Sequence, residues 1–187
     1  MGAIDIGSAA TDRESNSSQG STLIDGNNPA NEDGIITQVE VWFYQNSGSA
    51  ATAAIFELVG VNTFTARSRQ TIGVVTAGAK HTASVSLAVK AGDFIGVYPG
   101  TQGSLERALS GTMVYFQNGD QTQCINQTFT SATANRSYSI YGTGVTLGGR
   151  RGMHRRIAMG FMTLPLMACG IYVPKRFWFV EKAIQSK

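Results

Sequence analysis

An alternation of apolar and small residues within His81–Gly100 (HTASVSLAVKAGDFIGVYPG) places the strongest constraint on the fold. Val85, Leu87 and Val89 alternate with serine and alanine, and a period of two is typical of a strand with one buried face. The sequence KAGD then predicts a tight turn into a second strand, which Pro99-Gly100 ends. This stretch therefore predicts two consecutive β-strands.

The same period recurs along the first four-fifths of the chain. In IITQVEVWFYQNSG, Val39, Val41 and Phe43 alternate with polar or exposed-face residues, and Trp42 and Tyr44 fall on the polar face. Further strands are predicted at 53–58, 112–120 and 137–144, and weaker ones at Ile4–Gly7, Thr22–Asp25, Thr71–Val75 and Gln123–Phe129. About eight to ten short strands at this spacing, without helical periodicity, predict an all-β antiparallel sandwich that is jelly-roll-like.

The charge changes sign near Gly149. Residues 1–149 carry seven Lys/Arg against eleven Asp/Glu, a balance of −4, whereas residues 150–187 carry eight against one, a balance of +7. The basic isoelectric point therefore belongs to the C-terminal segment. We expect a β-sandwich body over 1–149 and a basic, apolar C-terminal extension over 150–187.

Several turns and strand ends carry a family resemblance. The segments IDIGSAATDR, LIDGNNPANEDGIITQVEVW, VKAGDFIGVYPG, LERALSG and YSIYGTG resemble small β-sandwich domains of uncharacterised phage and environmental viral structural proteins. The resemblance covers about residues 3–144 and contains no catalytic signature. It implies a virion-associated β-sandwich, transfers no functional residues, and does not extend to residues 150–187.

No catalytic constellation is visible in the sequence. The two histidines, His81 and His154, lie far apart, and no nucleophile, zinc or phosphate-loop motif accompanies them. Cys124 and Cys169 lie on opposite sides of the charge boundary and are interpreted as free thiols. The first residues lack the basic start and apolar run of a secretory signal. We expect a protein that is not an enzyme and has no cofactor.

The loop DGNNPANEDG, Asp25–Gly34, allows one metal hypothesis. Its side-chain oxygens are of the kind that Ca²⁺ takes, and the candidate ligands are Asp25, Asn27, Asn31 and Asp33. Asn, Asp, Pro and Gly are also the residues that turns require. A structural loop and a calcium site are therefore both open.

The segment Ile157–Val173 has no charged residue over 17 positions, which is the short end of a membrane-spanning length. Pro165 and two glycines interrupt it, and extended segments that break at proline and glycine also suit an arm packed on a partner. An assembly arm, a membrane segment, and strands or a helix added to the body all remain open. As an arm, it would present the apolar residues Ile157, Phe161, Leu164, Leu166, Ile171, Val173, Phe177, Trp178 and Phe179.

Four arginines precede this segment within seven positions: Arg150, Arg151, Arg155 and Arg156. Clustered arginines bind phosphates, so contact with packaged nucleic acid is one interpretation of this cluster. A solvated basic linker is the simpler interpretation, because no aromatic residue is interleaved with the arginines.

Taken together, these features predict a non-enzymatic virion structural protein, a shell, decoration or fibre subunit located in the virion. Its partners would be other copies of itself and other virion proteins, with nucleic acid or membrane contacted through residues 150–187. The alternative is a lectin-like domain held at a surface by a C-terminal membrane segment.

Overall fold

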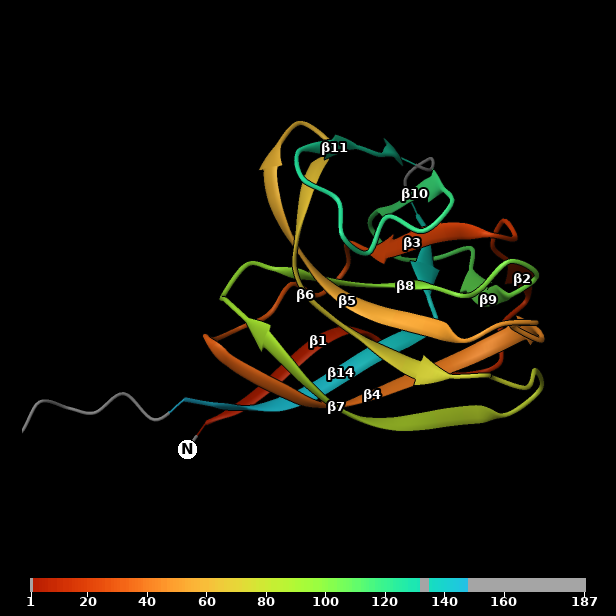
Figure 1. Cartoon of the computed structure of the whole chain (residues 1–187), viewed down its shortest axis with the longest axis horizontal. Helices are drawn as coiled ribbons and strands as arrows, with labels where there is room; N and C mark the ends of the chain where they lie inside the picture. Colours follow the sequence, from red (N-terminus) through yellow and green to blue (C-terminus); the bar gives the residue numbers. More distant parts are fainter. Residues whose placement is uncertain (1, 132–134, 148–187) are drawn as a thin grey trace, which may run out of the picture. The chain divides into compact units, whose positions relative to one another are not determined.

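The computed structural model describes residues 2–131 and 135–147, and within them every regular element is a β-strand (Figure 1). None of these residues belongs to a helix of the length and hydropathy that crossing a membrane requires. The strands form two antiparallel sheets that face each other, which confirms the predicted antiparallel sandwich.

Each sheet is built around four strands. In the first sheet β1, β14, β4 and β7 lie side by side: Ala3–Ser8, Ile140–Thr146, Gly34–Gln45 and Lys80–Val89. In the second sheet β3, β8, β5 and β6 lie side by side: Ser21–Asp25, Phe94–Tyr98, Ala51–Gly60 and Thr63–Gly73.

The pairing of these strands is nested. β5 and β6 form a hairpin, β4 pairs with β7, β3 pairs with β8, and β1 pairs with β14. The neighbours β4 and β5 belong to different sheets, as do β6 and β7, so the chain crosses between the layers outside the central hairpin. This eight-stranded, two-sheet arrangement is a jelly roll, as the sequence predicted.

A long insertion separates β8 from β14 and carries five of the short strands. β9 and β13, with β2 from the N-terminal region, extend the first sheet: Ser104–Ala108, Ser137–Tyr138 and Ser15–Asn16. β10 and β12 extend the second sheet beside β3, and β11 pairs with β6: Val114–Asn118, Thr130–Ser131 and Gln127–Thr128. The insertion therefore adds to both layers of the jelly roll.

The main core lies between the two sheets. Val39, Val41 and Phe43 of β4 are fully buried in it, and Leu87 of β7 joins them, as their alternation predicted. Tyr44, on the opposite side of β4, is half exposed. The apolar faces of both sheets are thus removed from water, which is the main driving force for folding.

A second, aromatic cluster lies within the second sheet and its insertion. Phe64 packs edge-to-face against Phe56, Phe94, Tyr115 and Phe129, with ring centroids 4.9–6.5 Å apart in the measured pairs. Edge-to-face packing places the positive ring edge on the negative face of the neighbouring ring. Phe129 comes from the insertion, so the cluster holds the insertion onto β5 and β6.

Candidate functional site

Four loops meet at one end of the jelly roll, because nested antiparallel strands return their connections to the same side. Asn46 after β4 accepts a hydrogen bond from the Ala77 amide after β6, at 2.8 Å. The Thr101 amide after β8 donates to Ser49 Oγ at 3.3 Å. The connection before β3 reaches the same place, since Gly20 faces the Thr101 carbonyl.

An open cleft of about 340 Å³ lies at this end and is lined by Gln19, Gln45, Asn46 and Gln102. We call it the amide cleft, because all four side chains are carboxamides. Gln19 Nε2 donates to Gln45 Oε1, and Ser104 Oγ donates to the same oxygen at 3.2 Å. The lining carries no net charge, and every lining group is both a donor and an acceptor.

The connection after β4, which carries Asn46, is held by one buried contact. Ser47 is fully buried and exchanges two hydrogen bonds with Val75, at 3.0 and 2.9 Å. Gly48 has a φ of +66°, and a Cβ there would lie 2.9 Å from Gln102 Oε1. A side chain at position 48 would therefore displace Gln102, and glycine is the residue that this conformation favours.

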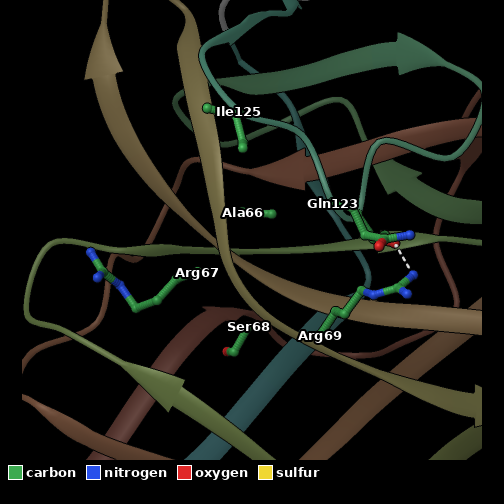
Figure 2. Close-up of a pocket in the computed structure, with 7 residues that line it drawn as sticks. Ala66, Arg67, Ser68, Arg69, Gln123 and Ile125 are labelled. Atoms are coloured by element: carbon green, nitrogen blue, oxygen red, sulfur yellow. Dashed lines mark hydrogen bonds between the residues drawn. The ribbon is translucent and has the colours of Figure 1, made fainter.

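A second cleft, of about 260 Å³, lies between β6 and the connection from β10 to β11 (Figure 2). Arg67 and Arg69 extend from β6 in opposite directions, on either side of Ser68. Arg67 forms ion pairs with Asp93 and Glu57, whereas Arg69 Nη1 donates to Thr122 Oγ1 at 3.5 Å. The two guanidinium groups do not converge on a common ligand position.

The Asp25–Gly34 loop forms hydrogen bonds with main-chain groups of β1. Asn31 Oδ1 accepts from the Asp5 amide at 3.3 Å, and its Nδ2 donates to the Ala3 carbonyl at 3.2 Å. The Asn28 carbonyl accepts from the Gly7 amide at 2.8 Å. Among the described strands, β1 pairs only with β14. The bonds from the loop cap its outer edge, and unpaired edges favour association with other chains.

The four predicted calcium ligands point to different partners. Asn27 Oδ1 accepts from Thr112, Asp33 Oδ1 accepts from the Ala91 amide at 2.8 Å, and Asp25 Oδ1 accepts from the Asn27 amide at 3.0 Å. Within residues 2–131 and 135–147, no three His, Cys, Asp or Glu side chains gather as a metal-binding group. Calcium binding stays a prediction, and the observed geometry is that of a structural loop.

Asp25 is fully buried at the end of β3. Burial raises the pKa of its carboxyl above the ordinary value, because the charged form loses its hydration, and hydrogen bonds from Asn27 oppose part of that rise. One of its oxygens, Oδ2, has no hydrogen-bond partner among the described residues. Ionisation of the buried Asp25 carboxyl therefore lowers the stability of the folded state. The hydrogen bond that it accepts from the Asn27 amide gives it a structural role.

His81 and Cys124 also have structural contacts. His81 Nε2 lies 3.1 Å from the Ile72 carbonyl and joins the edges of β7 and β6. The Cys124 thiol donates to the Phe64 carbonyl at 3.5 Å, and burial raises its pKa. A raised thiol pKa disfavours the reactive thiolate at neutral pH. Neither residue lies beside a second group with which it could perform catalysis in the described part of the chain.

The assembly and phosphate-contact residues lie outside the described residues. They are Ile157, Phe161, Leu164, Leu166, Ile171, Val173, Phe177, Trp178 and Phe179, with Arg150, Arg151, Arg155 and Arg156, together with His154 and Cys169. Their predicted roles, and the boundary at residue 149, stay predictions.

Comparison with protein-family models, with curated proteins and with solved structures found no match to this chain. The amide cleft was not predicted from the sequence, because its four side chains come from three separate segments. The only local signal is a set of glutamines next to Gly-rich turns, at SSQGS and GTQGS.

Proposed function

We propose that the protein is a non-enzymatic structural subunit of a virion, which assembles with other copies of itself through residues 150–187. The observation that supports this most directly is that residues 2–131 and 135–147 form a jelly roll with a filled core and a capped β1 edge. The sequence adds to this body a 17-residue run without a charged residue, Ile157–Val173. A large exposed apolar patch marks an interaction site, and we assign that role to this run.

The exposed tip of the β5–β6 hairpin also supports association. Leu58, Val59 and Val61 are exposed there, Val61 by 89%, and Ile125 beside β6 is exposed by 78%. The proposed occupant of this tip is the apolar, +7 extension of a second copy, because the body has a balance of −4. Opposite charge favours that encounter over association between two bodies.

Sedimentation velocity and electron microscopy of the full chain test the proposal. The full chain should form particles or oligomers, whereas a chain that ends at Gly149 should be monomeric, with β-type circular dichroism and one cooperative melt. Replacing Leu164→Asp and Leu166→Asp in the full chain should give monomers, because a buried charge without a partner is costly. Assembly that survives this double substitution contradicts the arm. A monomeric full chain that partitions into lipid vesicles supports the membrane alternative instead.

A further inference from the structure

We propose that the amide cleft binds a neutral carbohydrate. The cleft lies at the loop end of the jelly roll, and its volume of about 340 Å³ is at the lower end of the range for small-molecule sites. This inference concerns the body of the protein and does not depend on assembly through residues 150–187.

The chemistry of the lining selects the class of ligand. A carboxamide presents a carbonyl acceptor and two N–H donors, and each sugar hydroxyl is likewise a donor and an acceptor. An anion would find no cationic side chain among the four lining residues, and an apolar ligand would leave their amides without partners. A ligand rich in neutral hydroxyl groups satisfies them.

Several amide atoms in the cleft remain available for such a ligand. Gln45 Nε2, Asn46 Nδ2 and both polar atoms of Gln102 make no hydrogen bond to another described residue, and neither does Gln19 Oε1. The other atoms of the same groups are already engaged with Gln19, Ser104 or Ala77. Three of the four amides, those of Gln19, Gln45 and Asn46, therefore use one polar atom in a hydrogen bond, and their other polar atom has no partner among the described residues.

These hydrogen bonds reduce the conformational entropy that the lining side chains lose when a ligand binds. Gln45 is held through Oε1 and Asn46 by the Ala77 amide, whereas the exposed Gln102 makes no hydrogen bond to a described residue. Side chains that are already ordered lose less rotamer freedom when a ligand arrives. The cleft has no aromatic lining, so a single sugar should bind weakly, with a Kd on the order of 1 mM. Many copies on one particle would raise the avidity.

The test is a panel of neutral and anionic glycans on a microarray, followed by saturation-transfer NMR of the full chain with glucose, galactose, mannose and N-acetylglucosamine. Glucuronate is the anionic control. We expect saturation transfer from at least one neutral sugar and none from glucuronate. Binding should fall at least about tenfold with Gln102→Leu and with Gln45→Met, since each loses an amide that faces the ligand.

Gln123→Leu is the matched control, because Gln123 is an exposed glutamine that lines the other cleft. It should bind the sugar as the unaltered chain does. Gln102 lies in an exposed loop, so its variant tests the site even where Gln45→Met lowers stability. The proposal is overturned by the absence of any neutral-glycan signal, by selective binding of the anionic glycan, or by binding that both cleft variants leave unchanged.

Discussion

The guanidinium of Arg67 donates to both carboxylate oxygens of Asp93, through Nε at 2.5 Å and through Nη2 at 3.1 Å. The side chain of Asp93 is 4% exposed and that of Arg67 is 19% exposed. Asp93 also accepts a bond from the Lys90 amide, in the turn before β8. This pair thus connects β6 to the turn between β7 and β8.

Arg67→Met should lower the free energy of unfolding by about 2–4 kcal/mol, because it leaves the Asp93 charge buried without its partner. Urea denaturation followed by circular dichroism measures the change. Glu57→Gln is the matched control, since Glu57 also pairs with Arg67 but is 50% exposed, and exposed pairs contribute about 0–1 kcal/mol. Equal effects of the two substitutions would show that burial does not decide the value of this pair.

Asn31→Ala should uncover the outer edge of β1 and lower stability by about 0.5–1.5 kcal/mol. In hydrogen exchange, the Asp5 amide should lose its protection, whereas the Gly7 amide should keep it, because the acceptor of Gly7 is the main-chain carbonyl of Asn28. Asn28→Ala is the control, since it retains that carbonyl. An unchanged exchange rate at Asp5 would contradict the capping role of Asn31.

Asp25→Asn should stabilise the protein increasingly as the pH rises. The folded-state pKa of Asp25 is raised by burial, so the unfolded chain ionises first, near pH 4. Wild-type stability from this group is complete below that pH and is lost as the pH rises through the folded pKa. The asparagine oxygen can still accept from Asn27. Melting temperatures at pH 3.5, 5 and 7 should show a widening gap between the two proteins, and a constant gap would argue against the buried acid.

Removal of Phe129 should loosen the insertion before the rest of the fold. Phe129→Ala should cost about 3–5 kcal/mol through the cavity that it leaves against Phe56 and Phe64. In a Cys169→Ser background, labelling of Cys124 by a thiol reagent should become several-fold faster under native conditions. Labelling at the original rate would show that the aromatic cluster does not hold the insertion in place.

Added calcium tests the remaining metal hypothesis. Because the loop oxygens already accept hydrogen bonds from Thr112, Ala91 and Asn27, we expect no change in melting temperature between millimolar Ca²⁺ and a chelator. A ligand that binds only the folded state raises the melting temperature by mass action. A rise that Asp33→Asn abolishes would therefore establish calcium binding at the loop.

The long strands could be predicted because each carries its own periodic signal. β4 buries every second residue from Val39 to Phe43, and β7 does so from Val85 to Val89, so Val41 and Leu87 could be placed in the core from sequence alone. β9 could not be predicted in this way. In its sequence SLERA, Glu106 is buried along with Leu105 and Ala108, and a buried charged residue removes the pattern that identifies a strand.

The candidate sites were harder to predict than the fold, because they depend on long-range contacts. Gln19, Gln45 and Gln102 meet only after three loops have reached the same end of the sandwich. Phe64 and Phe129 are single aromatic residues whose contact spans the insertion. The secondary-structure propensities of single residues carry no information about contacts between residues far apart in the sequence. The nested order of the strands determines those contacts.

The pairing of β1 with β14 has a consequence for biosynthesis. Ala3 faces Val145, so the first of these strands to leave the ribosome has its partner in the last. Until Ile140–Thr146 emerges, β1 and one side of β4 have no backbone partner for most of their length. The nascent chain therefore has unpaired strand edges until synthesis is nearly complete. Partly folded chains with such edges are prone to aggregation and are bound by chaperones. A chain truncated before Ile140 would lack β14, so β1 and one side of β4 would stay unpaired.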